Sequence, residues 1–383
     1  MIVVFARSMK TASNKKIIGA LKEAEEGWYQ INPVDYVAFI SSKTNGYDHL
    51  EIFNSEEPLK EGAILKRPKV CIWRGGATGM YGAMIHSHLI CMGVPCTHTP
   101  MAIKCVSNKI LAHQLMSAAG VKNPKTRIVP SLEGDKWEKY YKRIGKGNGG
   151  QVIIKTIYGS QGAGVYYCKN LRHAKTTVKE LLDDGFKGSV MFQQFIETAD
   201  DDGRVSDIRA VVINGEIIVA MKRTSDKGSE DKTANISTGG TGEKIELTDD
   251  QREIVLKAAE SCDMLYSICG VDLVTDANDE TYVLELNSNI GLKVQDFTGV
   301  NVAKYIVEFA KELRNGDGVS MMERNKYFKN SIESNRLRSN FEYSKELIKS
   351  WNRVIEMTSG IVPDSIPTNI QKRYPNRAYE KDE

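Results

Sequence analysis

The amino-acid sequence predicts a mixed architecture, with an α/β segment first and α+β segments after it. Residues 1–105 alternate short apolar strands with helical stretches, which is the order typical of an α/β unit. Later segments contain hairpin signals, and Asn214-Gly215 between two apolar runs is the strongest of them. A chain of 383 residues is long enough for two or three domains with a sizeable core.

The first elements follow from hydrophobic periodicity. Buried strands are expected at 1–6 (MIVVFA), 36–40 (YVAFI) and 70–73 (VCIW), and an amphipathic helix at 14–26. A further helix over 107–120 begins at a capping serine and ends at a glycine.

The later elements alternate hairpins with helices. A glycine-rich turn joins two strands, a helix and a strand follow, and two hairpins are separated by a helix that Thr248 caps. A closing helix ends near residue 316. Beyond it the chain is rich in both charges and then in proline, which predicts an appended helical segment with a loose tail.

Composition excludes several classes of protein. Hydrophobic residues make up 41% and charged residues 26%, as in a soluble globular protein. A net charge of +3 is too small to favour nucleic acid or a membrane surface as the main partner, and no apolar stretch reaches the ~20 residues of a membrane span. Seven cysteines without a CxxC pair, and no signal-peptide pattern, predict a cytoplasmic protein with reduced thiols.

The stretch HSHLICMGVPCTH gathers His86, His88, Cys91, Cys96 and His98. These residue types suit zinc, but their spacing fits no standard zinc finger or ribbon. An apolar stripe through the same stretch predicts a helix. The sequence therefore favours small buried cysteines and histidines on a helix surface.

The stretch YVLELNSNIGL places Glu285 and Asn287 on one face of an apolar strand, because residues two apart in a strand share a face. If Asp276 pairs with Thr281 across the preceding turn, Asp272 lies opposite Glu285. Like charges in opposite positions destabilise a hairpin, and Mg²⁺, which prefers oxygen ligands, would relieve the conflict. A solvated acidic sheet face is the alternative.

The stretch VIIKTIYGSQGAGV places Lys155 at a strand end, with Gly159, Gly162 and Gly164 in the turn after it. Glycines let backbone N–H groups approach phosphate oxygens, and the lysine adds a positive charge. The pattern matches neither a Walker loop nor the GxGxxG fingerprint. A structural β-turn is the alternative.

Together, these motifs resemble the ATP-grasp fold, in particular the RimK-like carboxylate–amine ligases, over roughly residues 70–310. KTIYGSQGAGV resembles the family's lysine and flexible glycine-rich loop, and GVDL…LELNSNIGL resembles its metal hairpin. FQQFIE resembles the strand that holds adenine, and SDIRAVVINGEIIVAMKR the hairpin after it. CVSNKILAHQLMSAAGVKNPKT resembles the helix that opens the ATP-grasp region.

The resemblance implies an ATP-grasp fold in which ATP lies between two α+β subdomains. The implied segments are an N-terminal α/β (pre-ATP-grasp) domain at 1–105, a central subdomain at 106–196, a C-terminal subdomain with the metal hairpin at 197–315, and a helical extension and tail at 316–383.

The resemblance also implies cofactors and site residues. ATP and Mg²⁺ are expected, with two ions bridged by Glu285 and Mn²⁺ as a substitute. The implied phosphate contacts are Lys109, Lys155, Gly159, Gly162, Gly164 and Asn235. Gln194 and Phe195 are the implied adenine contacts, and Asp207 is the implied contact on the sugar side. The implied metal ligands are Asp272, Glu285 and Asn287.

The family's reaction activates a carboxylate as an acyl phosphate, which an amine then attacks while ADP and phosphate are released. Arg209 and Arg223 are the candidates for binding the acceptor carboxylate or the transferred phosphoryl group. A surface ion pair, such as Arg209 with a nearby acid, is the alternative role. In a plain Asn214-Gly215 hairpin register the two arginines face opposite sides of the hairpin.

Two departures from the family pattern concern substrates. Gln194 stands where the family commonly has an acid, which alters the adenine contact. Thr233 and Thr238 stand where the family has arginines that bind phosphates or acidic substrates. Their absence argues against glutamate as the amino acid added.

The sequence thus predicts an ATP-dependent carboxylate–amine ligase. Its partners would be ATP, an amino acid or amine, and a carboxylate acceptor, which includes peptides, proteins and small molecules. Another ATP-grasp kinase or biosynthetic ligase, and a non-catalytic nucleotide-binding regulatory module, are the alternatives. The extension after 316 would bind a macromolecular acceptor, cover the core or form a homo-oligomer.

Overall fold

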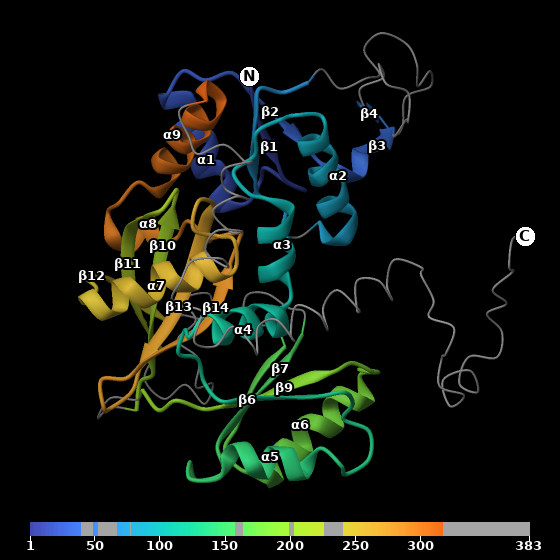
Figure 1. Ribbon diagram of the computed structural model, residues 1–383, viewed down its shortest axis with the longest axis vertical. Coiled ribbons are helices and arrows are strands. Elements are labelled where there is room, and N and C mark those ends of the chain that lie inside the picture. Colours follow the sequence, from blue (N-terminus) through green and yellow to red (C-terminus); the bar gives the residue numbers. More distant parts are fainter. Residues whose placement is uncertain are drawn as a thin grey trace, which may run out of the picture. The chain divides into compact units, whose positions relative to one another are not determined.

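The computed structural model describes residues 1–39, 49–52, 67–76, 78–157, 164–198, 203–225 and 240–316. Within these residues the strands form a three-stranded, a four-stranded and a five-stranded sheet and one two-stranded ribbon (Figure 1). The predicted helical extension lies outside the described residues, apart from Gly316.

An α/β unit opens the chain, as predicted. Its parallel sheet has the order β2-β1-β5, formed by Trp28–Ile31, Ile2–Phe5 and Val70–Trp73. The helix α1 (Ala12–Glu23), capped by Thr11, packs on one face of this sheet, and α2 (Gly79–Cys91) packs on the other. The expected strands at 1–6 and 70–73 are confirmed, whereas β2 was not expected because its sequence, WYQI, lacks a clear apolar pattern.

The segment predicted as a strand at 36–40 does not join the parallel sheet. It follows the short 3₁₀ helix η1 (Pro33–Asp35) and forms β3 (Tyr36–Phe39), which pairs antiparallel with β4 (His49–Ile52). The two strands make a separate ribbon beside the sheet.

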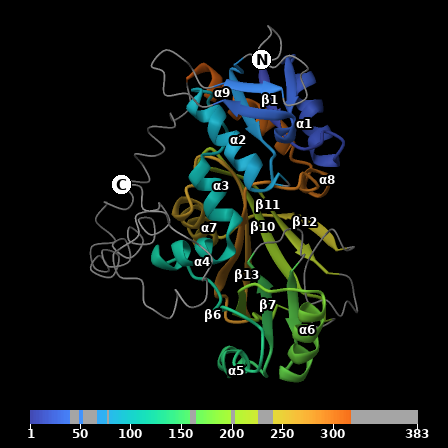
Figure 2. The same ribbon diagram turned by 90° about the vertical axis from the view of Figure 1, so that its right-hand side faces the viewer.

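The second sheet is antiparallel and has the order β6-β9-β7-β8. Its strands are Thr126–Val129, Val190–Gln194, Val152–Thr156 and Val165–Cys168. The helices α5 (Glu138–Gly145) and α6 (Leu171–Asp183) cover one face, where Ile154 and Phe192 are buried (Figure 2). Alternation along β7 therefore turns Lys155 to the opposite face.

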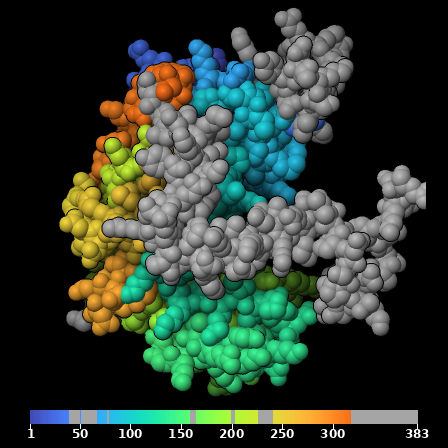
Figure 3. Space-filling model, viewed as in Figure 1, coloured from blue at the N-terminus to red at the C-terminus, as the bar shows by residue number. Residues whose placement is uncertain are grey.

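The third sheet is antiparallel and has the order β12-β11-β10-β13-β14. Its strands are Thr241–Ile245, Glu216–Thr224, Ser206–Ile213, Ile268–Thr275 and Thr281–Asn287. One face packs against three helices: α3 (Pro100–Ser107), α4 (Lys109–Ala118) and α7 (Asp249–Ser261). Thr248 caps α7 in a capping box, as expected. In the space-filling view the orange hairpin β13–β14 borders the green part of the chain (Figure 3). The Val283 N–H of this hairpin donates at 2.9 Å to the carbonyl of Lys122, which lies between α4 and β6.

A β-bulge corrects the predicted register of the first hairpin. Asn214-Gly215 forms the turn as expected, with φ of 49° and 87°. The register then shifts by one residue, so that Asp207 rather than Ser206 pairs with Arg223 and Arg209 pairs with Met221. The expectation that the two arginines face opposite sides is therefore wrong, because the extra residue on β11 reverses the alternation.

A second bulge affects the hairpin β13–β14. Thr275, not Asp276, pairs with Thr281, so the assumed register of the turn is wrong. An irregularity between Asp272 and Leu273 shifts the pairing by one residue and brings Asp272 opposite Glu285. The expected opposition of the two acids is confirmed, although the bulge and not the turn produces it.

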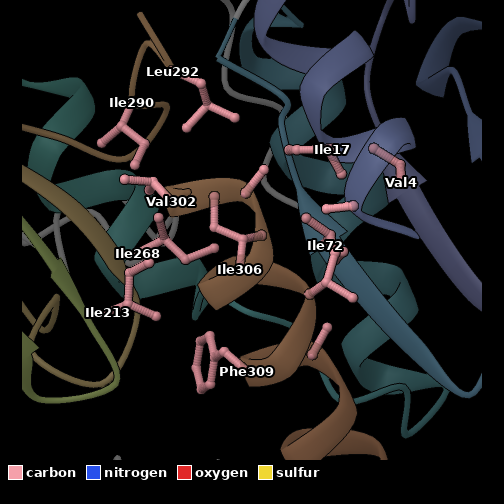
Figure 4. Close-up of a cluster of buried hydrophobic side chains, with 14 of the residues drawn as sticks. Val4, Ile17, Ile72, Ile213, Ile268, Ile290, Leu292, Val302, Ile306 and Phe309 are labelled. Atoms are coloured by element: carbon pink, nitrogen blue, oxygen red, sulfur yellow. The ribbon is translucent and has the colours of Figure 1, made fainter. Parts of the chain in front are cut away.

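The closing helix joins the first and third sheets. Ile306 and Phe309 of α9 (Val302–Asn315), which follows the short helix α8 (Val294–Thr298), lie between Ile72 on one side and Ile213 on the other (Figure 4). All four side chains are nearly fully buried in one cluster. Through α9, the apolar end of the third sheet therefore packs against the first sheet.

The histidines of the stretch that resembled a zinc motif are not on the helix surface. The predicted helix is confirmed as α2, but His86 and His88 are buried, and so is His98 after it. Of the two cysteines in that stretch, Cys96 is buried as expected and Cys91 is exposed. Because α2 packs on the sheet and also contacts η1, β3, β4 and α3, histidines on more than one side of the helix are covered.

Among the helices in the described part of the chain, none combines the length and the apolar character that crossing a membrane requires.

Replacing Gly164 by alanine should destabilise the second sheet. Gly164 has a φ of +78°, and a Cβ there would lie 2.0 Å from the Thr156 Oγ1. Gly185, with a φ of +81° and open space around it, is the matched control. We expect Gly185→Ala to cost about 1 kcal/mol of unfolding free energy through its backbone, and Gly164→Ala to cost about 1–3 kcal/mol more through overlap. Urea unfolding measures both, and equal losses would contradict this close approach.

Candidate functional site

A row of charged side chains crosses one face of the third sheet. Arg223 on β11 lies opposite Asp207 on β10, and Arg209 on β10 lies opposite Asp272 on β13. Asp272 in turn lies opposite Glu285 on β14. Because residues two apart share a face, Asp207 and Arg209 point the same way and the row is continuous over four strands.

The two arginines hold the buried carboxylates. The Arg209 Nε donates to the Asp272 Oδ1 at 2.6 Å, and the Arg223 Nη2 lies 3.1 Å from the Asp272 Oδ2. Arg223 also donates from Nε and Nη2 to both oxygens of Asp207. The charges of two carboxylates and two guanidinium groups therefore balance. Both arginines thus have the alternative role named from the sequence, an ion pair with a nearby acid. The pairs lie largely out of solvent and not on the surface.

The arginines set the protonation of Asp272. Burial acts to raise the pKa of this carboxyl group, but Arg209 and Arg223 outweigh it and hold the pKa at about 2. Asp272 is therefore an anion at neutral pH. The conflict between opposing acids that the sequence indicates is thus relieved on the Asp272 side by arginine. The sequence offered an ion pair of Arg209 with a nearby acid as an alternative, but it did not identify Asp272 as that acid.

Glu285 and Asn287 complete the acidic end of the row. Both side chains are half-buried, and the Asn287 Nδ2 donates to the Glu285 Oε1 at 3.1 Å. Carboxylate and amide oxygens on one face, next to an anionic Asp272, form a donor set that suits Mg²⁺. The predicted metal residues are therefore together, and their chemistry fits a hard cation.

Lys155 of the second sheet faces this row. Its side chain is 6% exposed, and burial lowers its pKa, whereas the negative charges of Glu285 and Asp272 raise it. Lys109, the first residue of α4, is a third charged neighbour and acts to lower the pKa of Lys155. Two predicted phosphate ligands and two predicted metal ligands thus converge from two sheets and one helix.

Asn108 explains the position of Lys109. Its Oδ1 accepts from the Ile110 and Leu111 N–H groups at 3.0 and 3.1 Å, so it caps α4 in place of the expected serine. Ser107 is instead the last residue of α3. The cap fixes where the helix begins, and therefore the direction in which the Lys109 side chain extends from it.

Of the three glycines of the glycine-rich loop, Gly164 is the one within the described residues. The Thr156 N–H donates to the Gly164 carbonyl at 2.8 Å and so closes the loop after β7. Gly159 and Gly162 lie outside the described residues, as does Asn235. Their expected phosphate contacts stay predictions.

Gln194 and Phe195, the expected adenine contacts, lie at the end of β9. The Gln194 N–H donates to the Lys125 carbonyl at 2.8 Å, and the Phe195 carbonyl accepts from the Asn148 Nδ2 at 2.8 Å. The Phe195 ring is buried, 4.8 Å from the ring of Tyr167. An adenine contact at Gln194 would therefore use its carbonyl or its half-buried side chain.

Sequence reasoning missed His113 and Gln193. His113 lies one helical turn after Lys109 and is buried, with its Nε2 3.4 Å from the Gln193 Nε2. The Gln193 Nε2 also donates to the Thr126 Oγ1 at 3.1 Å. Burial lowers the pKa of His113 to about 3, and Lys155 adds to this shift. The spacing of four residues from Lys109 on a helix was the signal available in the sequence.

Comparison with known proteins agrees with this fold. A sequence model of the RimK-like ATP-grasp domain matches residues 106–310. A probable alpha-L-glutamate ligase of Vibrio atlanticus is 27% identical over 312 residues, which cover 81% of this chain and 95% of that protein. A probable alpha-L-glutamate ligase of Shewanella loihica is 29% identical over 267 residues, covering 69% and 83% of the two chains.

Solved structures share the fold at low identity. The ATP-grasp ligase PsnB complexed with a minimal precursor has a TM-score of 0.59 at 16% identity, covering 82% of this chain and 98% of that one. A RimK domain ATP-grasp protein of Sphaerobacter thermophilus has a TM-score of 0.56 at 15% identity, covering 81% and 98%. D-alanine–D-alanine ligase of Bacillus anthracis has a TM-score of 0.53 at 14% identity, covering 83% and 100%.

The three sheets, with Lys155 of the second sheet facing the charged row of the third, have the arrangement of the ATP-grasp fold that these solved structures share. The chain belongs to the RimK-like ATP-grasp family, whose model matches more than half of its length. The resemblance seen in the sequence motifs is thereby confirmed.

Removing one arginine of the row should cost considerable stability. Arg223→Met leaves Asp207 and part of Asp272 as buried charges without this partner, and we expect a loss of about 3 kcal/mol or more in unfolding free energy. Lys179→Met, which breaks the exposed pair with Asp183 on α6, should change stability little. Chemical unfolding of both variants is the measurement, and equal small effects would show that the row is not a buried network.

His113 should make stability depend on pH. Its pKa is about 3 in the folded protein against 6.5 in a model compound, so the unfolded chain binds the proton first. The free energy of unfolding should fall by up to about 1.4 kcal/mol per pH unit as pH drops from about 6.5 towards 3. His113→Gln should remove this part of the slope, and His173→Gln on α6 should keep it. An unchanged slope in His113→Gln would refute the assignment.

Proposed function

We propose that the chain joins an amine to a carboxylate through an acyl phosphate and releases ADP and phosphate. The observation that carries this proposal is the meeting of Lys155 with the Asp272–Glu285 pair across two sheets, next to the buried Arg223 and the half-buried Arg209. Such a reaction needs positive charge and a metal around a triphosphate more than it needs a protein nucleophile.

In the proposed site, Asp272, Glu285 and Asn287 would hold Mg²⁺, as two ions, with Mn²⁺ as a substitute. When bound, Mg²⁺ supplies charge neutralisation for the triphosphate. Lys109 and Lys155 bind phosphate oxygens, helped by Gly159, Gly162, Gly164 and Asn235. Gln194 and Phe195 hold adenine. Asp207, whose oxygens both accept from Arg223, would reach the sugar through their remaining lone pairs.

The arginines have donors left for a substrate. A guanidinium group carries five N–H donors, and Arg209 uses Nε and Nη2 for Asp272. The acceptor carboxylate attacks the γ-phosphorus, the bond to the β-bridging oxygen breaks, and ADP leaves. The amine then attacks the acyl carbon, phosphate leaves with the C–O bond electrons, and the amine loses a proton. The arginines stabilise the negative charge on the phosphoryl group in the first step and on the leaving phosphate in the second.

The amine is proposed to be an amino acid other than glutamate. The relatives are named alpha-L-glutamate ligases, but Thr233 and Thr238 stand where the family resemblance places arginines for acidic groups. PsnB, which has a similar fold, has been solved in complex with the precursor peptide PsnA2. The proposed acceptor is therefore a peptide, a protein or a small carboxylic acid.

Two further predictions remain part of the proposal. The domain limits lie at residues 105, 196 and 315, and the protein is cytoplasmic.

Product analysis tests the proposal. ADP and AMP are measured with Mg-ATP and each of the twenty amino acids, in the absence and presence of candidate peptide acceptors. We expect ADP formation that depends on particular amino acids and falls by roughly a hundredfold in Glu285→Gln. Glu246→Gln, at an exposed residue paired with Arg252, is the control and should keep full activity.

Each other outcome has a defined meaning. AMP as the product would replace acyl phosphate chemistry with adenylation. A stable phosphorylated product without free phosphate would make the protein a kinase. Tight ATP binding without turnover under all conditions, unaffected by Glu285→Gln, would favour a regulatory nucleotide-binding module.

A further inference from the structure

A second cluster of potential ligands lies in the N-terminal α/β unit, away from the nucleotide site. Cys71 lies on β5, and Cys96 pairs with it in a parallel bridge at the edge of the sheet. His86 projects from the middle of α2, the helix that covers this face. One ligand atom from each of the three side chains lies within 4.8 Å of the others.

The backbone holds the two cysteines in place. The Cys71 N–H donates to the Pro95 carbonyl at 2.8 Å, and the Thr97 N–H donates to the Cys71 carbonyl at 2.9 Å. Paired residues of a parallel bridge point to the same face of a sheet, so both sulfur atoms are directed at α2. The exposed fractions of Cys71, His86 and Cys96 are 0%, 0% and 1%.

His86 has an unusual environment for a buried histidine. Among the described residues, neither its Nδ1 nor its Nε2 has a hydrogen-bond partner. Its ring instead lies edge-on to Trp73 and Phe5, with centroid distances of 4.6 and 5.9 Å. A ring edge against an aromatic face satisfies an N–H weakly, and it leaves the acceptor nitrogen of the neutral imidazole unpaired.

His98 shows how a buried histidine in the same unit is normally satisfied. Its Nδ1 lies 3.1 Å from the Thr97 Oγ1, and its Nε2 lies 2.9 Å from the Ile268 carbonyl. Burying a polar group without a partner is unfavourable. The orphaned nitrogens of His86 beside two thiols therefore call for a ligand.

We propose that Cys71, His86 and Cys96 form a zinc site. Two thiolates and an imidazole form a donor set that binds zinc in preference to magnesium. On binding, one Zn²⁺ enters, the two thiols release two protons, and the complex with two thiolates has no net charge. Water takes the fourth position of the tetrahedral ion.

The distances allow such a site with small adjustments. Bond lengths of about 2.3 Å to sulfur and 2.0 Å to nitrogen place tetrahedral ligand atoms roughly 3.5–3.8 Å apart. The three atoms, within 4.8 Å of one another, would approach by at most about 1.0–1.3 Å, which side-chain rotation supplies. The ion would then tie β5 and the segment around Cys96 to α2.

The position of the site suggests what the ion would stabilise. Beyond β5 the chain continues through Arg74, which donates to the Asn14 Oδ1 at 3.1 Å, to Gly76, where a Cβ would lie 2.9 Å from Asn289. Asn289 follows the metal hairpin by two residues. A zinc ion behind β5 would therefore stiffen the segment that borders the proposed catalytic site, without taking part in the reaction.

Metal binding by the full-length protein tests this proposal. The protein is purified without a histidine tag, kept reduced, loaded with Zn²⁺ and dialysed, and bound zinc is measured by mass spectrometry. Co²⁺ is used in parallel, since cobalt–thiolate bonds give charge-transfer absorption in the near ultraviolet. We expect one equivalent of zinc per chain and the thiolate band with cobalt.

Three variants locate the ion. Cys71→Ser/Cys96→Ser should lose both the retained zinc and the cobalt band. Cys168→Ser/Cys269→Ser, which changes two equally buried cysteines elsewhere, should keep both. Glu285→Gln should also keep both, because the proposed site is independent of the nucleotide site.

Several results would overturn the proposal. Folded, reduced wild-type protein that retains no zinc and shows no cobalt–thiolate band would refute it without any variant. Loss of zinc in Glu285→Gln or in the control pair would place the ion elsewhere. A Cys71–Cys96 disulfide that persists in protein isolated under reducing conditions would replace the metal site with a covalent link.

Discussion

The buried carboxylate of Asp272 is the constraint on which the candidate site depends. It is 4% exposed, and two arginines from neighbouring strands hold it as an anion. Both arginines reach it because a bulge in β11 brings Arg223 to the face that already carries Arg209. A second bulge places Glu285 opposite the same carboxylate. Two single-residue irregularities therefore assemble one row of charged side chains on an otherwise regular sheet.

The rest of the molecule positions this row. The same face of the third sheet is apolar at its other end, where Val211 and Ile213 pack under α9 against the first sheet. The second sheet presents Lys155 from the face that its helices leave open. The capping residue Asn108 orients α4, which carries Lys109 and His113. Neutral His113 beside two lysines avoids a third positive charge in this region.

Local rules predicted much of the fold and part of the site. The Asn214-Gly215 turn and the cap of α7 followed from short-range patterns. The opposition of Asp272 and Glu285 was predicted from a wrong turn register, and a bulge restores it. The bulges did not follow from such patterns, because an extra strand residue is decided by packing on both faces and leaves no clear mark in one sequence. The partners of the arginines, and the contact of His113 with Gln193, depend on residues far along the chain. Long-range packing of this kind is where local periodicity stops being informative.

The most direct test of this account is a double-mutant cycle on Mg-ATP affinity, measured by calorimetry on Lys155→Met, Glu285→Gln and the combined variant. If one triphosphate with its metal spans the two sheets, each single change removes an interaction that the other supports. The combined loss should then differ from the sum of the single losses by about 1 kcal/mol or more. Strictly additive losses, or an effect of one residue alone, would contradict a nucleotide held between the two sheets.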